Sequence, residues 1–220
     1  MKFELTRIRW KAKRSSVFRT FGVSFLASGA ALTVHIMSGV SLRLAIVASI
    51  SLVALVTGWI WRRASTEDRS QLNRRVRAGL IAGAVATASY DVAKFALSQL
   101  DPSPYNPFEA IRIFGGLLTQ SSMPGVVLYG AGTVFHLLNG ISFGIAFCLL
   151  FRQPGPLKGI AWGMFLEIFQ LTLFPGWLDI RFYREFVQIS ALSHVVYGMV
   201  LGVSCRYGMK HRATRVEAAL

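Results

Sequence analysis

Long apolar runs bounded by basic residues dominate this sequence. Between Thr20 and Leu42, and again between Leu44 and Trp61, no side chain is acidic and none is Lys or Arg. A helix needs about 20 apolar residues to cross the hydrocarbon core of a bilayer. Charged residues make up only 15% of the chain, below the roughly one quarter usual in soluble domains. The sequence therefore predicts an all-α, polytopic membrane helix bundle.

The predicted bundle has about six transmembrane helices. They are expected within 20–42, 44–61, 78–100, 124–151, 159–175 and 186–205. An amphipathic stretch near 108–118 predicts a short interfacial helix, which follows a proline-rich turn that ends the third span. The first apolar run follows a basic segment, as in a signal peptide, but it is long enough to span and is expected to be retained.

Basic residues collect on one side of the predicted spans. The basic N-terminal segment 1–19, the predicted connecting loop 62–77 and the tail 206–220, together with the turn after the fourth span, hold 19 of the 24 Lys and Arg. The positive-inside rule then predicts that both termini are cytoplasmic, in a bacterial inner (plasma) membrane. The regions between are two helices in 20–61 and a four-helix bundle in 78–205. The net charge of +14 fits anionic lipid headgroups rather than nucleic acid, because the basic residues flank apolar spans.

Two predicted spans carry the same pattern, a histidine followed by glycines four and eight residues later. Residues four apart lie along one face of a helix, and small residues there let a neighbouring helix approach closely. A histidine on such a face points into protein rather than lipid. The two ridges are His136, Gly140, Gly144 and His194, Gly198, Gly202.

The span that precedes each of these carries a second ridge of small residues, which leads to an acidic side chain. These ridges are Gly79, Gly83, Thr87, Asp91 and Gly159, Gly163, Glu167. Spans three to six therefore resemble two copies of one helix pair in the same orientation, a parallel repeat. Small residues at this spacing are also common in unrelated membrane helices, so independent packing is the alternative.

The acidic and histidine side chains of these ridges are predicted to share one depth. The helix rise places them about 13 to 24 Å from the cytoplasmic flank, between the middle and the outer third of a bilayer. We therefore predict one buried polar layer, in which Lys94 is also placed to pair with Asp91. The candidates for this layer are Asp91, His136, Asn139, Glu167, His194 and Tyr197.

Ionisable groups at this depth either hold helices together or carry a function. One interpretation is a carboxylate–histidine network that only locks the helix pairs, with Asn139 and Tyr197 completing its hydrogen bonds. Another is a proton relay, or a site for a cation or polar solute, because both kinds of group change charge. A metal centre of histidine and carboxylate ligands and a haem held by His136 and His194 are further alternatives. The sequence requires no cofactor and leaves any metal unknown.

The leading hypothesis is a multi-pass inner-membrane protein that passes or senses a proton, an ion or a small polar solute through the acid–histidine layer. A non-catalytic accessory or assembly subunit of a membrane complex is the alternative, and a membrane-bound metal or haem enzyme is third. No catalytic motif favours an enzyme. A membrane-protein partner or a homo-oligomer is expected, with the first two spans as a contact face. Cys148 and Cys205 are interpreted as packing residues, because no disulfide framework follows from them.

Overall fold

All regular structure in the described part of the chain is helical. The computed structural model describes residues 17–173 and 180–217, with the side chains of 211–217 outside that description. Three predicted segments lie partly outside the described residues, together with the predictions made for them. They are the basic segment 1–19, the last polar loop and the tail 206–220.

Within the described residues, four helices are long and apolar enough to cross a membrane. They are α3 (Leu42–Arg63), α4 (Thr66–Ser98), α6 (Gly125–Leu150) and α8 (Tyr183–Glu217). The short helix Val17–Ser24 and α2 (Ala27–Ser38), which are bent by 50° at the break between them, make a fifth candidate if they form one span. These helices fit an integral membrane protein.

The six-span prediction is not confirmed, because α7 (Pro156–Leu173) is not among the candidate spans in the described residues. This helix has 18 residues, and three of them, Lys158, Glu167 and Gln170, are strongly polar. A further short helix, α5 (Glu109–Leu118), lies where the sequence predicts an amphipathic segment.

The predicted loop over 62–77 is wrong, because α4 begins at Thr66 and continues without interruption into the apolar region. The hydroxyl of Ser65 accepts a hydrogen bond from the backbone N–H of Asp68 at 3.1 Å, which caps the start of the helix. Glu67 and Asp68 in the first turn also favour this start, since they complement the helix dipole. The basic residues between 69 and 77 therefore belong to the first turns of α4 rather than to a loop.

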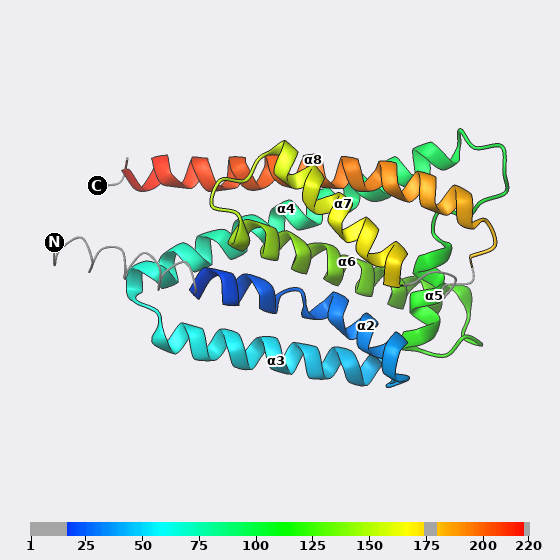
Figure 1. The fold of residues 1–220 in the computed structure, drawn as a ribbon, viewed down its shortest axis with the longest axis horizontal. Helices are drawn as coiled ribbons and strands as arrows, with labels where there is room; N and C mark the ends of the chain where they lie inside the picture. The colour runs from blue at the N-terminus through cyan, green and yellow to red at the C-terminus, as the bar shows by residue number, and fades with distance from the viewer. Residues whose placement is uncertain (1–16, 174–179, 218–220) are drawn as a thin grey trace.

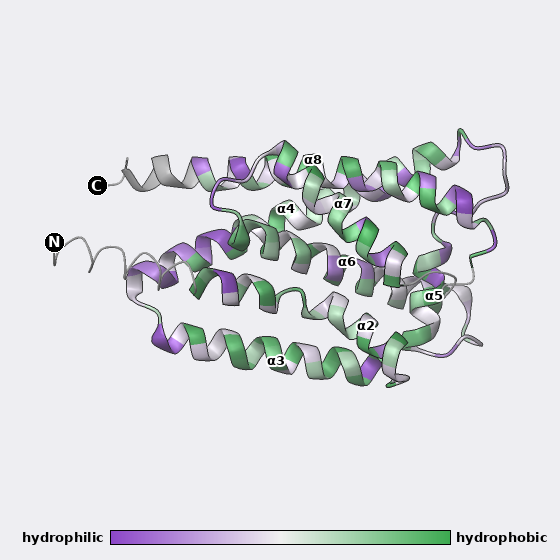
Figure 2. Cartoon of the chain, in the orientation of Figure 1, coloured by the Kyte–Doolittle hydropathy of each residue, from purple (hydrophilic) through white to green (hydrophobic). Residues whose placement is uncertain are grey.

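The long helices run side by side, with α4 packed against both α6 and α8 (Figure 1). The remaining helices add to this core: α7 packs on α8, α5 packs on α6, and α2 contacts α3. Hydrophilic residues gather where α3 ends and α4 begins (Figure 2). At this end Arg75 of α4 donates hydrogen bonds to the carbonyl oxygens of Cys148 and Phe151, at 2.8 and 3.2 Å.

Glycines allow two of the helix pairs to approach at backbone distance. Where α4 crosses α6, a methyl group added at Gly83 would lie 2.7 Å from the carbonyl oxygen of Gly140, and one at Gly144 would lie 2.5 Å from Cα of Gly83. Gly79 of the same ridge lies against Gly144. The crossing of α7 and α8 is equally close: Gly159 and Gly163 lie against Gly198, and Gly202 lies against Gly155. All eight predicted packing glycines therefore lie at helix contacts.

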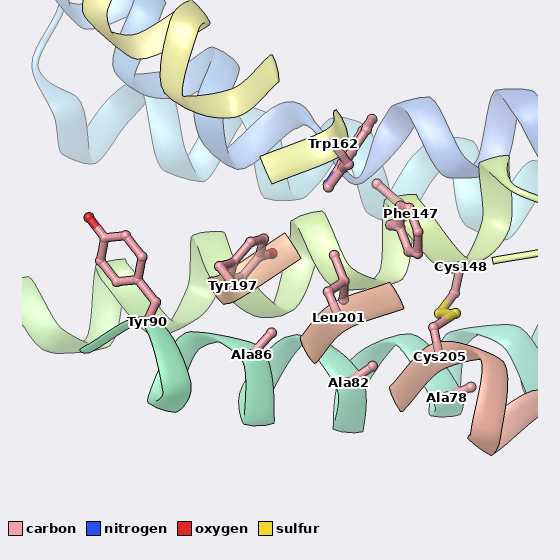
Figure 3. Packing of buried hydrophobic residues seen from close by; sticks show 11 residues of the cluster. Ala78, Ala82, Ala86, Tyr90, Phe147, Cys148, Trp162, Tyr197, Leu201 and Cys205 are labelled. Carbon is pink, nitrogen blue, oxygen red and sulfur yellow. A yellow bond between two sulfur atoms is a disulfide. The ribbon is translucent and has the colours of Figure 1, made fainter. Parts of the chain in front are cut away.

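The two cysteines meet, which corrects their interpretation as separate packing residues. Cys148 on α6 and Cys205 on α8 form a disulfide with a Cα–Cα distance of 6.1 Å, and both are fully buried. Figure 3 shows this bond beside Ala78 of α4, with Tyr90 at the opposite end of the same row of buried side chains. The disulfide links α6 to α8 near the ends of both apolar runs.

Candidate functional site

A cavity of about 140 Å³ lies among the helices that carry the predicted polar layer. Its polar lining comes from α4, α6, α7 and α8, and α5 contributes apolar side chains to the opposite wall. The polar lining residues are Thr87, Tyr90, Asp91, Lys94, His136, Asn139, Gln170, His194 and Tyr197. Five of the six candidates for the polar layer therefore line one cavity.

The first acid–histidine pair joins α4 to α6. Nε2 of His136 lies 3.0 Å from Oδ1 of Asp91, and the two side chains are 22% and 30% exposed. One turn away on both helices Gly140 lies against Thr87, so α4 and α6 approach closely beside this pair. Since a carboxylate oxygen only accepts, Nε2 carries the hydrogen.

The second pair joins α7 to α8 and is more deeply buried. Oε2 of Glu167 lies 2.9 Å from Nδ1 of His194, and the glutamate side chain is only 1% exposed. The same oxygen accepts hydrogen bonds from Gln170 Nε2 at 2.5 Å and from Ser190 Oγ at 3.0 Å, whereas Oε1 is buried without a partner. Glu167 itself does not line the cavity, and His194 separates it from that space.

Tyr90 connects the two pairs, although sequence reasoning did not select it. Its ring centroid lies 5.8 Å from that of His136 and 4.8 Å from that of His194. Its hydroxyl lies 3.2 Å from Oγ of Ser190, which in turn donates to Glu167. The predicted layer therefore consists of two pairs on either side of one tyrosine.

Lys94 does not pair with Asp91, which corrects the expectation of an ion pair on α4. In the described part of the chain no carboxylate lies within 4.0 Å of its ammonium group, since Asp91 contacts His136 instead. The ammonium lies over the rings of Tyr90 and Phe186, at 5.5 and 5.0 Å from their centroids. Lys94 is 5% exposed and lines the cavity.

Asn139 and Tyr197 also behave differently from the prediction that they complete the hydrogen bonds of the histidines. The hydroxyl of Tyr197 donates to the backbone carbonyl of Gly140 at 3.2 Å. Oδ1 of Asn139 is buried and accepts no hydrogen bond from the described residues. Both residues line the cavity without contacting an imidazole nitrogen.

The metal and haem alternatives find little support in this geometry. Among the described residues no three His, Cys, Asp or Glu side chains converge as metal ligands would, because the two pairs stay apart. The ring of Tyr90 contacts both histidines, where a haem held between them would need room.

The fold and the cavity define a membrane-like helical protein with a buried polar centre. The chain belongs to a family of unknown function, DUF6789, whose model matches residues 73–216. No curated protein and no solved structure matches the chain. The matched region begins within α4 and contains every residue of both acid–histidine pairs, whereas α2 and α3 precede it.

Proposed function

We propose that this chain is a multi-pass inner-membrane protein that passes or senses a proton together with a small polar solute in its cavity. The observation that carries the proposal is that the histidines of two acid–histidine pairs line one cavity, with the ring of Tyr90 against both imidazoles. Buried ionisable groups on membrane helices commonly mark proton relays and solute pathways.

Each histidine has one ring nitrogen committed to the protein and one available for exchange. Nε2 of His136 faces Asp91, and Nδ1 of His194 faces Glu167 and the Ser190 carbonyl. The second nitrogen of each ring makes no hydrogen bond to the described residues. A proton taken up there from the cavity gives an imidazolium that the neighbouring carboxylate stabilises.

The contacts of the two helix pairs support a parallel repeat. Gly83 meets Gly140 as Gly159 meets Gly198, and in both pairs the acid lies two helical turns after the first glycine and the histidine one turn before the second. In this interpretation α4 and α6 form one unit and α7 and α8 form the second, with the basic helix ends cytoplasmic. A duplicated unit would place the two proton sites symmetrically around the cavity.

Proton flux into proteoliposomes tests the proposal. We expect the wild-type chain to acidify vesicles that contain a pH-sensitive dye faster than protein-free vesicles, with the membrane potential clamped by potassium and valinomycin. His136→Ala and His194→Ala should lose this flux, whereas His35→Ala should retain it because His35 lies outside the cavity, at the end of α2. Equal rates for wild type and both cavity variants, with one fixed partner co-purifying, would favour an accessory subunit instead.

A further inference from the structure

Lys94 is a buried lysine whose ammonium has no carboxylate within 4.0 Å among the described residues. Its side chain is 5% exposed, and its ammonium contacts the faces of Tyr90 and Phe186 rather than a carboxylate. An ammonium group has three donors, and no hydrogen bond to the described residues uses them. Burial of an unpaired charge is costly, and aromatic faces compensate only part of that cost. Asp91 lines the same cavity but is paired with His136, so no described carboxylate lies within 4.0 Å of the Lys94 ammonium.

The cavity around Lys94 has both polar and apolar lining residues. Asn139 adds an amide whose Oδ1 is buried without a hydrogen-bond partner among the described residues, and an amide can donate as well as accept. The apolar part of the lining is aromatic and aliphatic and includes Leu32, Phe108, Phe114, Phe143 and Phe169. Such a space fits a solute that has one charged end and a short apolar body.

We propose that the cavity binds a small monocarboxylate, with Lys94 as the anchor for its charged end. A single ammonium suits the single charge of a carboxylate, whereas a phosphate carries more charge and more acceptor oxygens than Lys94 and one amide provide. A volume of about 140 Å³ suits a molecule of a few carbon atoms and leaves little room for a long acyl chain.

Proton uptake at the histidines favours this anion. The titratable groups facing the two imidazoles are Tyr90, Asp91 and Lys94 from α4, Glu167 from α7 and Tyr197 from α8. The lining residues from α2 and α5 are not titratable. With neutral imidazoles the two carboxylates outweigh the one ammonium, and with both imidazoles protonated the balance becomes positive. The cavity therefore attracts a carboxylate more strongly at lower pH.

Benzoate binding to the full chain in phosphatidylcholine nanodiscs tests the site. The probe is sodium benzoate in calorimetric titrations at pH 6 and pH 8, and benzamide is the neutral analogue. We expect saturable benzoate binding that is several-fold tighter at pH 6, with weaker binding of benzamide. Lys94→Met should weaken benzoate binding at least tenfold, whereas Lys158→Met should not, because Lys158 is exposed and bonds to the carbonyl of Gln153.

The benzoate experiment can fail or succeed independently of the proton-flux experiment. Only the pH dependence of binding rests on the proposed function. Absence of saturable benzoate binding, or equal binding by wild type and Lys94→Met, would overturn the carboxylate site even if proton flux persists. Benzoate binding that needs Lys94, without any proton flux, would retain the site and reject transport. Lys94→Met removes an unpaired charge and is expected to fold, and Asn139→Leu, expected to weaken binding several-fold, provides a second variant on another helix.

Discussion

Oε2 of Glu167 lies 2.9 Å from Nδ1 of His194 on the neighbouring helix, and neither side chain is more than 13% exposed. This pair differs from that of Asp91 and His136, which is about one quarter exposed and opens directly onto the cavity. The inner pair is therefore stabilised mainly by protein groups and reaches the cavity only through His194, whereas both members of the outer pair line the cavity.

Removal of the buried carboxylate should destabilise the bundle. Glu167→Ala leaves His194, Gln170 and Ser190 without their shared acceptor, and breaking a buried pair of this kind typically costs about 3 to 5 kcal/mol. The free energy of unfolding in mixed micelles measures the effect. Glu67→Ala, at an exposed position in the first turn of α4, should change it by less than about 1 kcal/mol. Similar losses in the two variants would contradict the importance of the buried network.

The glycine contacts predict opposite effects for two substitutions in α6. Gly144→Ala places a methyl group 2.5 Å from Cα of Gly83, so α4 and α6 must separate, and we expect a loss of about 1 to 3 kcal/mol. Gly130→Ala meets no atom within 4 Å and should be neutral or stabilising by up to about 1 kcal/mol, because alanine favours the helix. Thermal unfolding of the two variants in the same detergent compares them directly.

The disulfide predicts sensitivity to reducing agents. Alkylation without prior reduction should leave Cys148 and Cys205 unmodified in intact-mass measurements. A bond that closes a loop of 57 residues contributes about 4 kcal/mol in the chain-entropy model, so dithiothreitol should lower the unfolding midpoint. A variant with both cysteines changed to serine should show no response to dithiothreitol, and complete alkylation of unreduced wild type would contradict the bond.

Tyr105, in the segment between α4 and α5, predicts a loss of stability at alkaline pH. Burial raises the pKa of its hydroxyl above the ordinary value of 10, and the hydroxyl has no hydrogen-bond partner among the described residues. Because the folded state favours the neutral form, its contribution is complete below pH 10 and declines as the pH rises above it. Tyr105→Phe should therefore weaken the dependence of the unfolding midpoint on pH between 9 and 11. Unchanged pH dependence would indicate that Tyr105 ionises as freely in the folded chain as in the unfolded chain.

The apolar runs predicted the cores of α3, α4, α6 and α8 because hydrophobic length alone decides which helices can span. The start of α4 was missed because its signals are local: Ser65 and Asp68 form a helix cap, and basic charge was taken as a sign of a loop. The sequence predicted α7 as a span from the length of its apolar run. Lys158, Glu167 and Gln170 lower the mean hydropathy of this 18-residue helix, so it is not among the candidate spans in the described residues.

The candidate site was predictable where side chains share a ridge and unpredictable where they do not. Asp91 and His136 were selected by four-residue spacing, and Ser190 lies at the same spacing before His194, so that signal was available. Tyr90 lies one residue before Asp91 and off the ridge, and only the crossing of α4 with α8 brings it against His194. Lys94 was expected to pair within α4, but the proximity of His136 to Asp91 left it unpaired.

The disulfide lies at one end of the bundle and the cavity lies toward the other. Arg75 and the disulfide together fasten α4, α6 and α8 to one another near the hydrophilic ends of the helices. From the disulfide toward Tyr90, α4 contributes the small buried side chains of Ala78, Ala82 and Ala86 (Figure 3). We therefore expect any movement that admits a solute to be a hinge-like spreading of the two helix pairs about the fastened end, with the largest displacement beside Lys94.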